Sequence, residues 1–271
     1  MDNRPIGIFD SGVGGLTVAK EIHRLLPNES TIYFGDTARA PYGGKTANEL
    51  LQFSHEIVNF LLQKNVKAVV IACGTSSSVT YEKLLDEFPA LPIVDVIRPG
   101  VQACLQQPND RFGLIATAAT IKSGVFAKLL MDGFSTGCKS QPVENVTLHA
   151  RACPLFAPMV EAGLQPSHPA MQFAIEAYVG DLRNKIDALV LGCTHYPLLT
   201  DALASVLGNI EFINLGVAAA QATKERLMNA GLLADRSNKP THEYYVSGNA
   251  DVFCKTGKIV LGEEIVAVKF T

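Results

Sequence analysis

The sequence predicts an α/β protein with mainly parallel, doubly wound sheets that form two related halves. First, short apolar runs of strand length alternate with amphipathic stretches of helical spacing along the 271 residues. Second, two pairs of segments resemble each other in the same order along the chain. Third, 48% of the residues are hydrophobic and 18% are charged, which is typical of a globular chain that can bury a core.

Nine apolar runs have the length and the flanking turns of strands. In chain order they are Ile6–Phe9, Thr31–Phe34, Ala68–Ala72, Ile93–Val96, Phe112–Ala116, Val146–His149, Ala188–Gly192, Phe212–Asn214 and Tyr244–Ser247. Between the first of these runs, two sets of apolar residues recur at helical spacing: Leu16, Ala19, Ile22 and Leu26, then Leu50, Phe53, Ile57, Phe60 and Leu61. Strands and helices that alternate in this way favour parallel sheets covered by helices on both faces.

The repeated segments indicate that the two halves are related. RPIGIFDSGVGGLTVAKEI, from residue 4, resembles RFGLIATAATIKSGVFAKLL, from residue 111, and Gly7 falls opposite Gly113. KAVVIACGT, from residue 67, resembles DALVLGCTH, from residue 187, and Cys73 falls on Cys193. Ligands bind at the carboxyl ends of the strands in open α/β sheets. A pseudo-twofold axis between the halves therefore predicts that both cysteines approach one ligand from opposite sides.

Two opposed thiols suit a racemase that abstracts a Cα proton directly. Such an enzyme needs a base on one face of the carbon and an acid on the other, and these roles exchange in the reverse reaction. The reference pKa of a thiol is about 8.5, close enough to working pH for one cysteine to be a thiolate while the other keeps its proton. We therefore predict that Cys73 and Cys193 are the catalytic pair.

The residues that follow the cysteines can tune these thiols. Ser77 or Ser78 can cap a helix after Cys73, and Pro197 suits the first turn of a helix after Cys193. A helix N-terminus favours a thiolate and can also hold a carboxylate. Both cysteines are therefore expected next to helix N-termini.

Two further residues could exchange protons with the thiols or orient them. Asp10 ends the first predicted strand, and His195 lies two residues past Cys193. Taken alone, Asp10 could instead be a helix cap or a loop acid, and His195 a core histidine. Three other cysteines are predicted to be small core hydrophobes: Cys104, Cys138 and Cys254.

Composition excludes several classes of protein. The net charge is −3 and no run is rich in lysine and arginine, so we expect a small-molecule partner and no nucleic acid. The N-terminus lacks the apolar core of a signal peptide, and no apolar run reaches the length of a membrane span. We therefore expect a cytoplasmic protein with reduced cysteines and no membrane partner. No C-x-x-C pair occurs, so no metal site is predicted.

Nucleotide and pyridoxal motifs also fail. A G-x-G-x-x-G motif from Gly12 would need glycine at Thr17, and a Walker A loop ending at residues 44–46 would need glycine at Arg39. Pyridoxal phosphate would need a lysine for its Schiff base. The lysines that lie on amphipathic stretches are expected to be solvated: Lys20, Lys64, Lys67 and Lys83. The simpler prediction is direct chemistry with no cofactor.

Four blocks of the sequence resemble the glutamate racemases, the cofactor-independent enzymes that supply D-glutamate for bacterial peptidoglycan. The blocks are FDSGVGG from Phe9, GDTARAPYG from Gly35, ACPLFAPMVEAG from Ala152 and LGCTHYPLL from Leu191. The resemblance covers nearly the whole chain and implies racemisation of L-glutamate to D-glutamate. It also implies catalytic residues and substrate contacts. The implied catalytic residues are Cys73, Cys193, Asp10, His195, Asp36 and Glu161. The implied substrate contacts are Asp10, Ser11, Tyr42, Gly43, Thr75, Thr117, Thr120, Thr194 and His195.

The same resemblance implies two α/β domains with the active site in the cleft between them. We expect residues 1–97 and 212–271 to form the first domain, which carries Asp10 and Cys73. Residues 98–211 are expected to form the second domain, with Glu161, Cys193 and His195. A homodimer is expected only by analogy with the family.

Three positions depart from the family pattern. Gly74, at a position that contacts substrate in the family, stands where the family usually has asparagine, so another group or a water is expected in place of the missing amide. Arg98 replaces a common glutamate before Pro-Gly, and Asn214 with Leu215 replaces Asp-Ser. The last two departures are expected to affect domain packing or an interface.

Three other functions stay open on the sequence. One is an aspartate racemase or another amino-acid racemase of the same superfamily, although the THYP sequence after Cys193 favours glutamate. Another is a hydrolase that uses Cys193 with His195 and needs only one essential thiol. The third is an amino-acid-binding protein without catalysis, which would leave the paired thiols unexplained.

Overall fold

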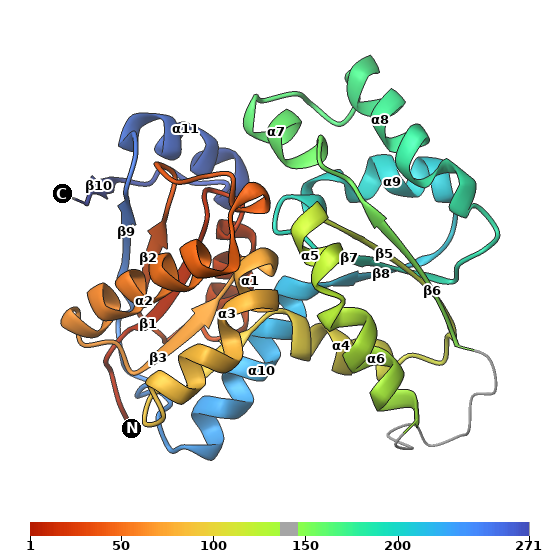
Figure 1. Cartoon of the computed structure of the whole chain (residues 1–271). Coiled ribbons are helices and arrows are strands. Elements are labelled where there is room, and N and C mark those ends of the chain that lie inside the picture. The colour runs from red at the N-terminus through yellow and green to blue at the C-terminus, as the bar shows by residue number, and fades with distance from the viewer. Residues whose placement is uncertain (136–145, 271) are drawn as a thin grey trace.

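The computed structural model describes residues 1–135 and 146–270, and it contains two parallel β-sheets flanked by helices (Figure 1). The six-stranded sheet has the order β10-β9-β2-β1-β3-β4 and the four-stranded sheet the order β6-β5-β7-β8. The strands are β1 (Ile6–Asp10), β2 (Thr31–Gly35), β3 (Ala68–Ile71), β4 (Ile93–Asp95), β5 (Arg111–Ala116), β6 (Thr147–Ala152), β7 (Ala188–Leu191), β8 (Glu211–Asn214), β9 (His242–Val246) and β10 (Ala267–Lys269). The predicted α/β class is confirmed.

Helices connect these strands and cover both faces of each sheet (Figure 1). The α-helices are α1 (Leu16–Leu25), α2 (Ala47–Gln63), α3 (Gly74–Glu87), α4 (Ile97–Leu105), α5 (Ala118–Ser123), α6 (Val125–Ser135), α7 (Phe156–Glu161), α8 (Pro169–Val179), α9 (Thr200–Leu207), α10 (Leu215–Asn229) and α11 (Ala250–Leu261). Short 3₁₀ helices are η1 (Tyr42–Gly44), η2 (Gly180–Leu182) and η3 (Tyr196–Leu199). Cys138, which was predicted to be a core residue, lies outside the described residues.

All nine predicted strands are present, and the strand order supports the internal repeat. The order β2-β1-β3-β4 in the first sheet corresponds to β6-β5-β7-β8 in the second. Gly7 of β1 pairs with Val69 of β3, and Gly113 of β5 pairs in the same way with Leu189 of β7. The strand that the sequence did not predict is β10, a three-residue edge strand.

Polar residues cap the N-termini of several helices. Thr46 caps α2 in a capping box with Glu49, in which each side chain accepts a hydrogen bond from the other residue's backbone N–H. Thr117 caps α5, and Asn214 caps α10. Each cap satisfies an N–H that the first helical turn leaves free.

One apolar core joins the two sheets. It contains Ile8 and Val70 from the first sheet and Leu114 and Val190 from the second. In Figure 1, α10 and α4 lie between the sheets at the lower centre, and α10 packs against both α1 and α4. Separate cores cover the outer faces of each sheet, under α2 and α3 on one side and under α8 and α9 on the other. The shared core therefore fixes one sheet against the other.

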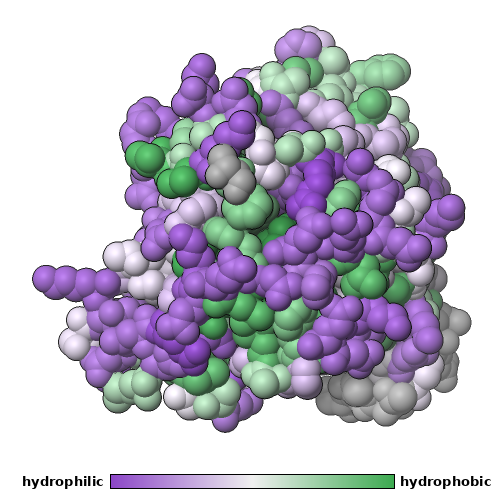
Figure 2. Space-filling view, turned by 60° about the vertical axis from the view of Figure 1, so that its left-hand side comes forward, coloured by the Kyte–Doolittle hydropathy of each residue, from purple (hydrophilic) through white to green (hydrophobic). Residues whose placement is uncertain are grey.

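The outer surface is mostly polar where it can be seen. Figure 2 shows a face on which hydrophilic residues predominate and hydrophobic residues form separate groups among them. No helix within residues 1–135 and 146–270 combines the length and the apolar character needed to cross a membrane.

The position of β8 bears on the predicted boundary between the domains at residue 212. We expected the first domain to resume at residue 212, but Glu211–Asn214 pairs with β7 in the second sheet. The chain returns to the first sheet only through α10, which contacts both β3 and β4. We propose a two-domain division in which the first domain resumes with α10.

The prediction that Lys67 is solvated is wrong. Its side chain is fully buried, and its Nζ lies 2.5 Å from Glu29 Oε2 and donates to the Asp2 carbonyl at 2.5 Å. The other Glu29 oxygen accepts from the Ala234 N–H at 2.7 Å. The amphipathic pattern around Lys67 could not show this, because the partners come from distant parts of the chain. This ion pair ties the N-terminus and the start of β3 to the loop after α10.

Replacement of Lys67 by methionine (Lys67→Met) is expected to destabilise the protein strongly. It leaves the buried Glu29 carboxylate without its cation, a change that costs about 3–5 kcal/mol. Chemical unfolding monitored by circular dichroism would measure the difference. The control Lys258→Met breaks an exposed pair with Glu264 and should change stability little. Equal losses in the two variants would contradict a special role for the buried pair.

Candidate active site

A cavity of about 260 Å³ lies at the carboxyl ends of the central strands of both sheets. Loops after β1, β3, β5 and β7 contribute to its wall, together with η1 and α7. Of the predicted site residues, those that line it are Ser11, Tyr42, Gly43, Cys73, Gly74, Thr75, Thr117, Glu161, Cys193, Thr194 and His195. The structure thus brings residues from both halves of the chain into one place.

Cys73 is the N-cap residue of α3, which begins at Gly74. The prediction that Ser77 or Ser78 caps this helix is wrong, because both lie inside it and the Ser77 hydroxyl donates to the Ile71 carbonyl at 3.1 Å. The Cys73 thiol is buried and donates to Ser11 Oγ over 3.9 Å. Burial and then the charge of Asp10 raise the pKa of Cys73 to about 12. Its proton is therefore held tightly at neutral pH.

Cys193 belongs to a chain of polar groups in the second half. Its Sγ lies 3.7 Å from His195 Nδ1, and His195 Nε2 lies 3.0 Å from Glu161 Oε1. Burial lowers the pKa of His195, but hydrogen bonds to Cys193 and Glu161 outweigh it and raise the pKa to about 10. At neutral pH His195 is therefore a cation that lies next to the Cys193 sulfur. As predicted, Pro197 lies in the first turn of the following helix, η3.

Asp10 ends β1 and lies behind the cavity wall. Its side chain is fully buried, and one oxygen accepts from the N–H groups of Gly12 at 3.2 Å and Gly15 at 3.0 Å. The other oxygen, Oδ1, has no hydrogen-bond partner within the described parts of the chain. Burial raises the pKa of Asp10, opposed by the charge of His195 and by these N–H groups. Asp10 therefore acts on the Cys73 thiol by its charge and retains one free acceptor.

Asp36 does not line the cavity. It is fully buried, accepts from Arg39 Nε at 2.6 Å and from the Ser247 hydroxyl at 2.7 Å, and receives the Tyr42 hydroxyl. Burial and then the charge of Asp36 raise the pKa of Tyr42. Asp36 thus holds Tyr42, which does line the cavity, next to Gly43.

Three threonine hydroxyls form a cluster where the two halves meet. Thr117 Oγ1 lies 2.9 Å from the hydroxyls of Thr75 and Thr120, and the last two are 3.5 Å apart. Thr75 belongs to α3 in the first half, and Thr117 caps α5 in the second. Thr120 lies behind the other two and does not line the cavity. The cluster presents hydroxyl groups from both halves to one ligand.

Gly74 permits a close approach between the halves. A Cβ atom added at Gly74 would lie 2.7 Å from the Gly192 carbonyl oxygen and 3.8 Å from the Thr120 hydroxyl. The Gly192 N–H donates to the Ile115 carbonyl at 2.8 Å, and this hydrogen bond holds the backbone at Gly192 in place. The backbone of the second half therefore takes the space that a side chain at residue 74 would need.

Several residues of the wall were not predicted. They are mainly small or apolar residues: Ala40, Pro41, Gly44, Ala118, Cys153, Pro154, Ala157, Pro158, Gly192 and Tyr196. Cys153 directly follows β6, and burial raises its pKa to about 12. Its position after a strand was the one signal that could have identified it. The small and apolar residues of the wall gave no such signal in the sequence, because they enclose the cavity and carry no reactive group.

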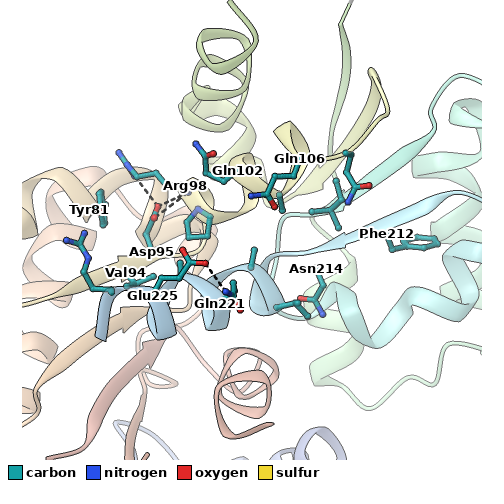
Figure 3. A pocket seen from close by; sticks show the side chains of 18 of the residues that line it. Tyr81, Val94, Asp95, Arg98, Gln102, Gln106, Phe212, Asn214, Gln221 and Glu225 are labelled. Carbon is teal, nitrogen blue, oxygen red and sulfur yellow. Dashed lines mark hydrogen bonds and ion pairs between the residues drawn. The ribbon is translucent and has the colours of Figure 1, made fainter. Parts of the chain in front are cut away.

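A second cavity, of about 540 Å³, lies between α4, α10 and the ends of β4 and β8. Figure 3 shows Arg98 joined to Asp95 by dashed lines, with Gln221 and Glu225 of α10 nearby. Arg98 also pairs with Glu82, and Asn214 caps α10 at the other end of this cavity. Arg98 and Asn214, which both depart from the family pattern, thus contribute to packing around the helices that join the sheets. No thiol lines this cavity.

The described residues contain no group of three or more histidine, cysteine, aspartate or glutamate side chains arranged to hold a metal ion. Three thiols line the cavity, those of Cys73, Cys153 and Cys193. Cys73 and Cys193 come from different halves, and Cys73 has an acid nearby and Cys193 an imidazole. Such an arrangement can remove a proton from one face of a small polar ligand and return a proton to the other.

Comparisons with known proteins find similar sequences and similar structures. The profile of the Asp/Glu/Hydantoin racemase family matches residues 6–223. A glutamate racemase of Thermoanaerobacter pseudethanolicus is 39% identical over 270 residues, which cover 98% of this chain and 96% of that protein. A solved glutamate racemase of Francisella tularensis, in complex with D-glutamate, is 34% identical with a TM-score of 0.89, over 100% of this chain and 98% of the other. The glutamate racemase isoform RacE1 of Bacillus anthracis gives 34% identity and a TM-score of 0.91 over the same shares.

Replacement of Glu161 by glutamine (Glu161→Gln) is expected to lower the pKa of His195 below its value of about 10. Glutamine can still accept a hydrogen bond but carries no charge, so the imidazolium loses an anionic partner that raises its pKa. NMR titration of the His195 ring, assigned with a His195→Asn variant, would measure the change. Glu176→Gln removes a surface partner of Arg183 instead and is a matched control that should leave the titration unchanged.

The same variant should alter the pH dependence of stability. The folded pKa of His195 lies above the usual 6.5, so its contribution to stability is complete below pH 6.5 and is lost as pH rises towards 10. Between these limits the free energy of unfolding should fall less steeply in Glu161→Gln than in the wild type. Parallel curves for the two proteins would mean that Glu161 does not hold the proton on His195.

Replacement of Gly74 by alanine (Gly74→Ala) is expected to cost about 1–3 kcal/mol of stability, because the new methyl group overpacks against the Gly192 carbonyl. Asparagine begins with the same Cβ and should do the same. Gly44→Ala is the control, since an added Cβ there meets nothing within 4 Å. Thermal unfolding would compare the variants, and a Gly74→Ala protein as stable as Gly44→Ala would contradict the close approach.

Proposed function

Because the chain belongs to the Asp/Glu/Hydantoin racemase family, we propose that it is a glutamate racemase that interconverts L-glutamate and D-glutamate without a cofactor. The observation that carries this proposal is the placement of Cys73 and Cys193, which follow equivalent strands of the two halves and line the same cavity. The glutamate racemases that match nearly the whole chain support the choice of substrate.

The proposed mechanism is a two-base proton transfer. One cysteine thiolate removes the Cα proton of glutamate, and the thiol of the other cysteine donates its proton to the opposite face of the carbon. The two sulfur atoms thereby exchange protonation states in each turnover. Because thiolate and thiol differ by one proton, the same pair catalyses the reverse reaction with the roles exchanged.

Different groups assist the two cysteines in this proposal. Beside Cys193, the His195 cation, supported by Glu161, stabilises the thiolate. Beside Cys73, the charge of Asp10 keeps the thiol protonated until substrate enters. Asp36 acts indirectly, because it holds the Tyr42 hydroxyl.

The wall of the cavity suits a ligand with two carboxylates and an ammonium group. Hydroxyls of Ser11, Thr75, Thr117 and Thr194 can donate to carboxylates, as can the backbone N–H groups at the start of α3. The cavity of about 260 Å³ is near the lower end of the size range for small-molecule sites, which fits an amino acid. We propose that Gly43 and Gly74 contribute through the backbone and that Thr120 orients the other two threonines of its cluster.

A second candidate function follows from the chain of contacts among Cys193, His195 and Glu161. A thiol next to an imidazole that a carboxylate orients is also the arrangement of a cysteine hydrolase. A hydrolase would not need Cys73, which makes the two candidates separable. An aspartate racemase uses the same pair of thiols and differs only in the length of the substrate.

Three finer statements belong to the same proposal and rest on the family alone. The D-glutamate would serve peptidoglycan biosynthesis, the enzyme would be cytoplasmic, and it would act as a homodimer.

Purified protein incubated with L-glutamate in D2O is expected to produce D-glutamate that carries deuterium at Cα. Cys73→Ser and Cys193→Ser should each lower kcat/KM by at least about 10²–10⁴-fold, since each removes an acid–base group. Cys254→Ser, which changes a half-buried cysteine of α11 away from the cavity, is the control and should keep full activity. Chiral chromatography and NMR would follow product and deuterium.

The outcomes distinguish the candidates. Absence of both deuterium incorporation and D-glutamate would rule out the glutamate racemase. Exchange with L-aspartate but not with L-glutamate would identify an aspartate racemase. Hydrolytic activity that survives in Cys73→Ser would favour the hydrolase.

A further inference from the structure

Ser76 is a buried serine close to Cys73 that the mechanism has not used. Its side chain is fully buried, and its Oγ lacks a hydrogen-bond partner among residues 1–135 and 146–270. It does not line the cavity, so it does not contact a ligand there. A buried hydroxyl without a partner costs free energy, and a partner gained in another state of the protein would explain why it is present.

The position of Ser76 in α3 identifies that other state. Cys73 is the N-cap residue, and Ser76 is the third residue of the helix. An acceptor at the N-cap receives hydrogen bonds from the second or third helical residue. Cys73 makes no such capping bond in its neutral form, and its thiol donates to Ser11 Oγ instead. Loss of the proton leaves the sulfur able only to accept.

The surroundings of the Cys73 sulfur have opposite effects on its pKa. Burial, the charge of Asp10 from β1 and the charge of Cys193 from the other half all raise the pKa of Cys73. The backbone N–H and the hydroxyl of Ser76 lower it, because hydrogen bonds from them favour the thiolate. Ser76 is thus a donor that opposes these effects.

We propose that Ser76 is a positioning residue for the Cys73 thiolate, to which its hydroxyl and its backbone N–H both donate once Cys73 has lost its proton. The sulfur then leaves Ser11 and caps α3, and the unpartnered Ser76 hydroxyl gains its acceptor. This inference rests on the acid–base role of Cys73 in the proposed function. Ser76 acts only through Cys73 and touches neither the substrate nor the reacting carbon.

The test measures the thiolate directly, without substrate. Initial rates of alkylation of Cys73 by iodoacetamide are measured between pH 8 and 9.5, with the Cys73 peptide quantified by mass spectrometry. Ser76→Ala is expected to lower this rate at least about fivefold at each pH, because it removes a hydrogen bond to an ionised group. The acidic limb of the kcat/KM profile for glutamate should move to higher pH in the same variant.

Ser54→Ala is the matched control. Like Ser76, Ser54 is fully buried, has a hydroxyl that lacks a partner in the described part of the chain and does not line the cavity. It differs in that it belongs to α2 and not to the helix that follows Cys73. Its alkylation profile should equal that of the wild type. Thermal midpoints of both variants are measured alongside, since a purely structural serine would change the midpoint and leave the alkylation of Cys73 unaffected.

The outcomes separate this proposal from the function on which it rests. Unchanged alkylation of Cys73 in Ser76→Ala, or an equal decrease in Ser54→Ala, would overturn the role of Ser76. A decrease confined to Ser76→Ala would support it even if the wild-type protein failed to racemise glutamate. In that case only the proposed reaction would be lost.

Discussion

The apolar core that joins the two sheets is the constraint on which the rest of the structure depends. Ile8 and Val70 of one sheet and Leu114 and Val190 of the other belong to the same buried cluster. Because such a core is closely packed, it fixes the relative position of the sheets to within small displacements. The strand ends above it therefore face one another, and the cavity between them has a defined width. Two thiols on separate sheets can act on one carbon atom only under this condition.

The thiols are equivalent by position, but the groups beside them are not. Asp10 ends β1, and the corresponding end of β5 is Ala116. His195 follows Cys193 by two residues, where the first half has Thr75. An acid therefore raises the pKa of Cys73, while a cation lies next to Cys193. The two thiols therefore lie in different electrostatic surroundings.

Glycines make the close contact between the halves possible. An added Cβ at Gly14 would lie 2.5 Å from the His195 ring, and one at Gly74 would lie 2.7 Å from the Gly192 carbonyl. Gly74 lines the cavity, and Gly14 lies in the loop after β1 that also supplies Ser11, so the walls consist partly of backbone. Backbone walls leave N–H groups available to a carboxylate and exclude side chains that would hold the halves apart.

The sequence by itself determined the strands, the internal repeat and the two cysteines, because each of these depends on local patterns of apolar residues and on spacing along the chain. It also indicated the residues around the thiols, through blocks that resemble a known family. Tertiary structure alone decided the rest. Lys67 has the pattern of a solvated lysine, yet Glu29 and Asp2 reach it from distant segments and bury it. Ser77 could have capped α3, but the N-cap residue is Cys73. The reason is that β3 ends at Ile71 and the helix begins soon after it, at Gly74. Periodicity reports which face of an element is buried, whereas the partner of a charge, a cap or a glycine is set by segments that meet only after folding.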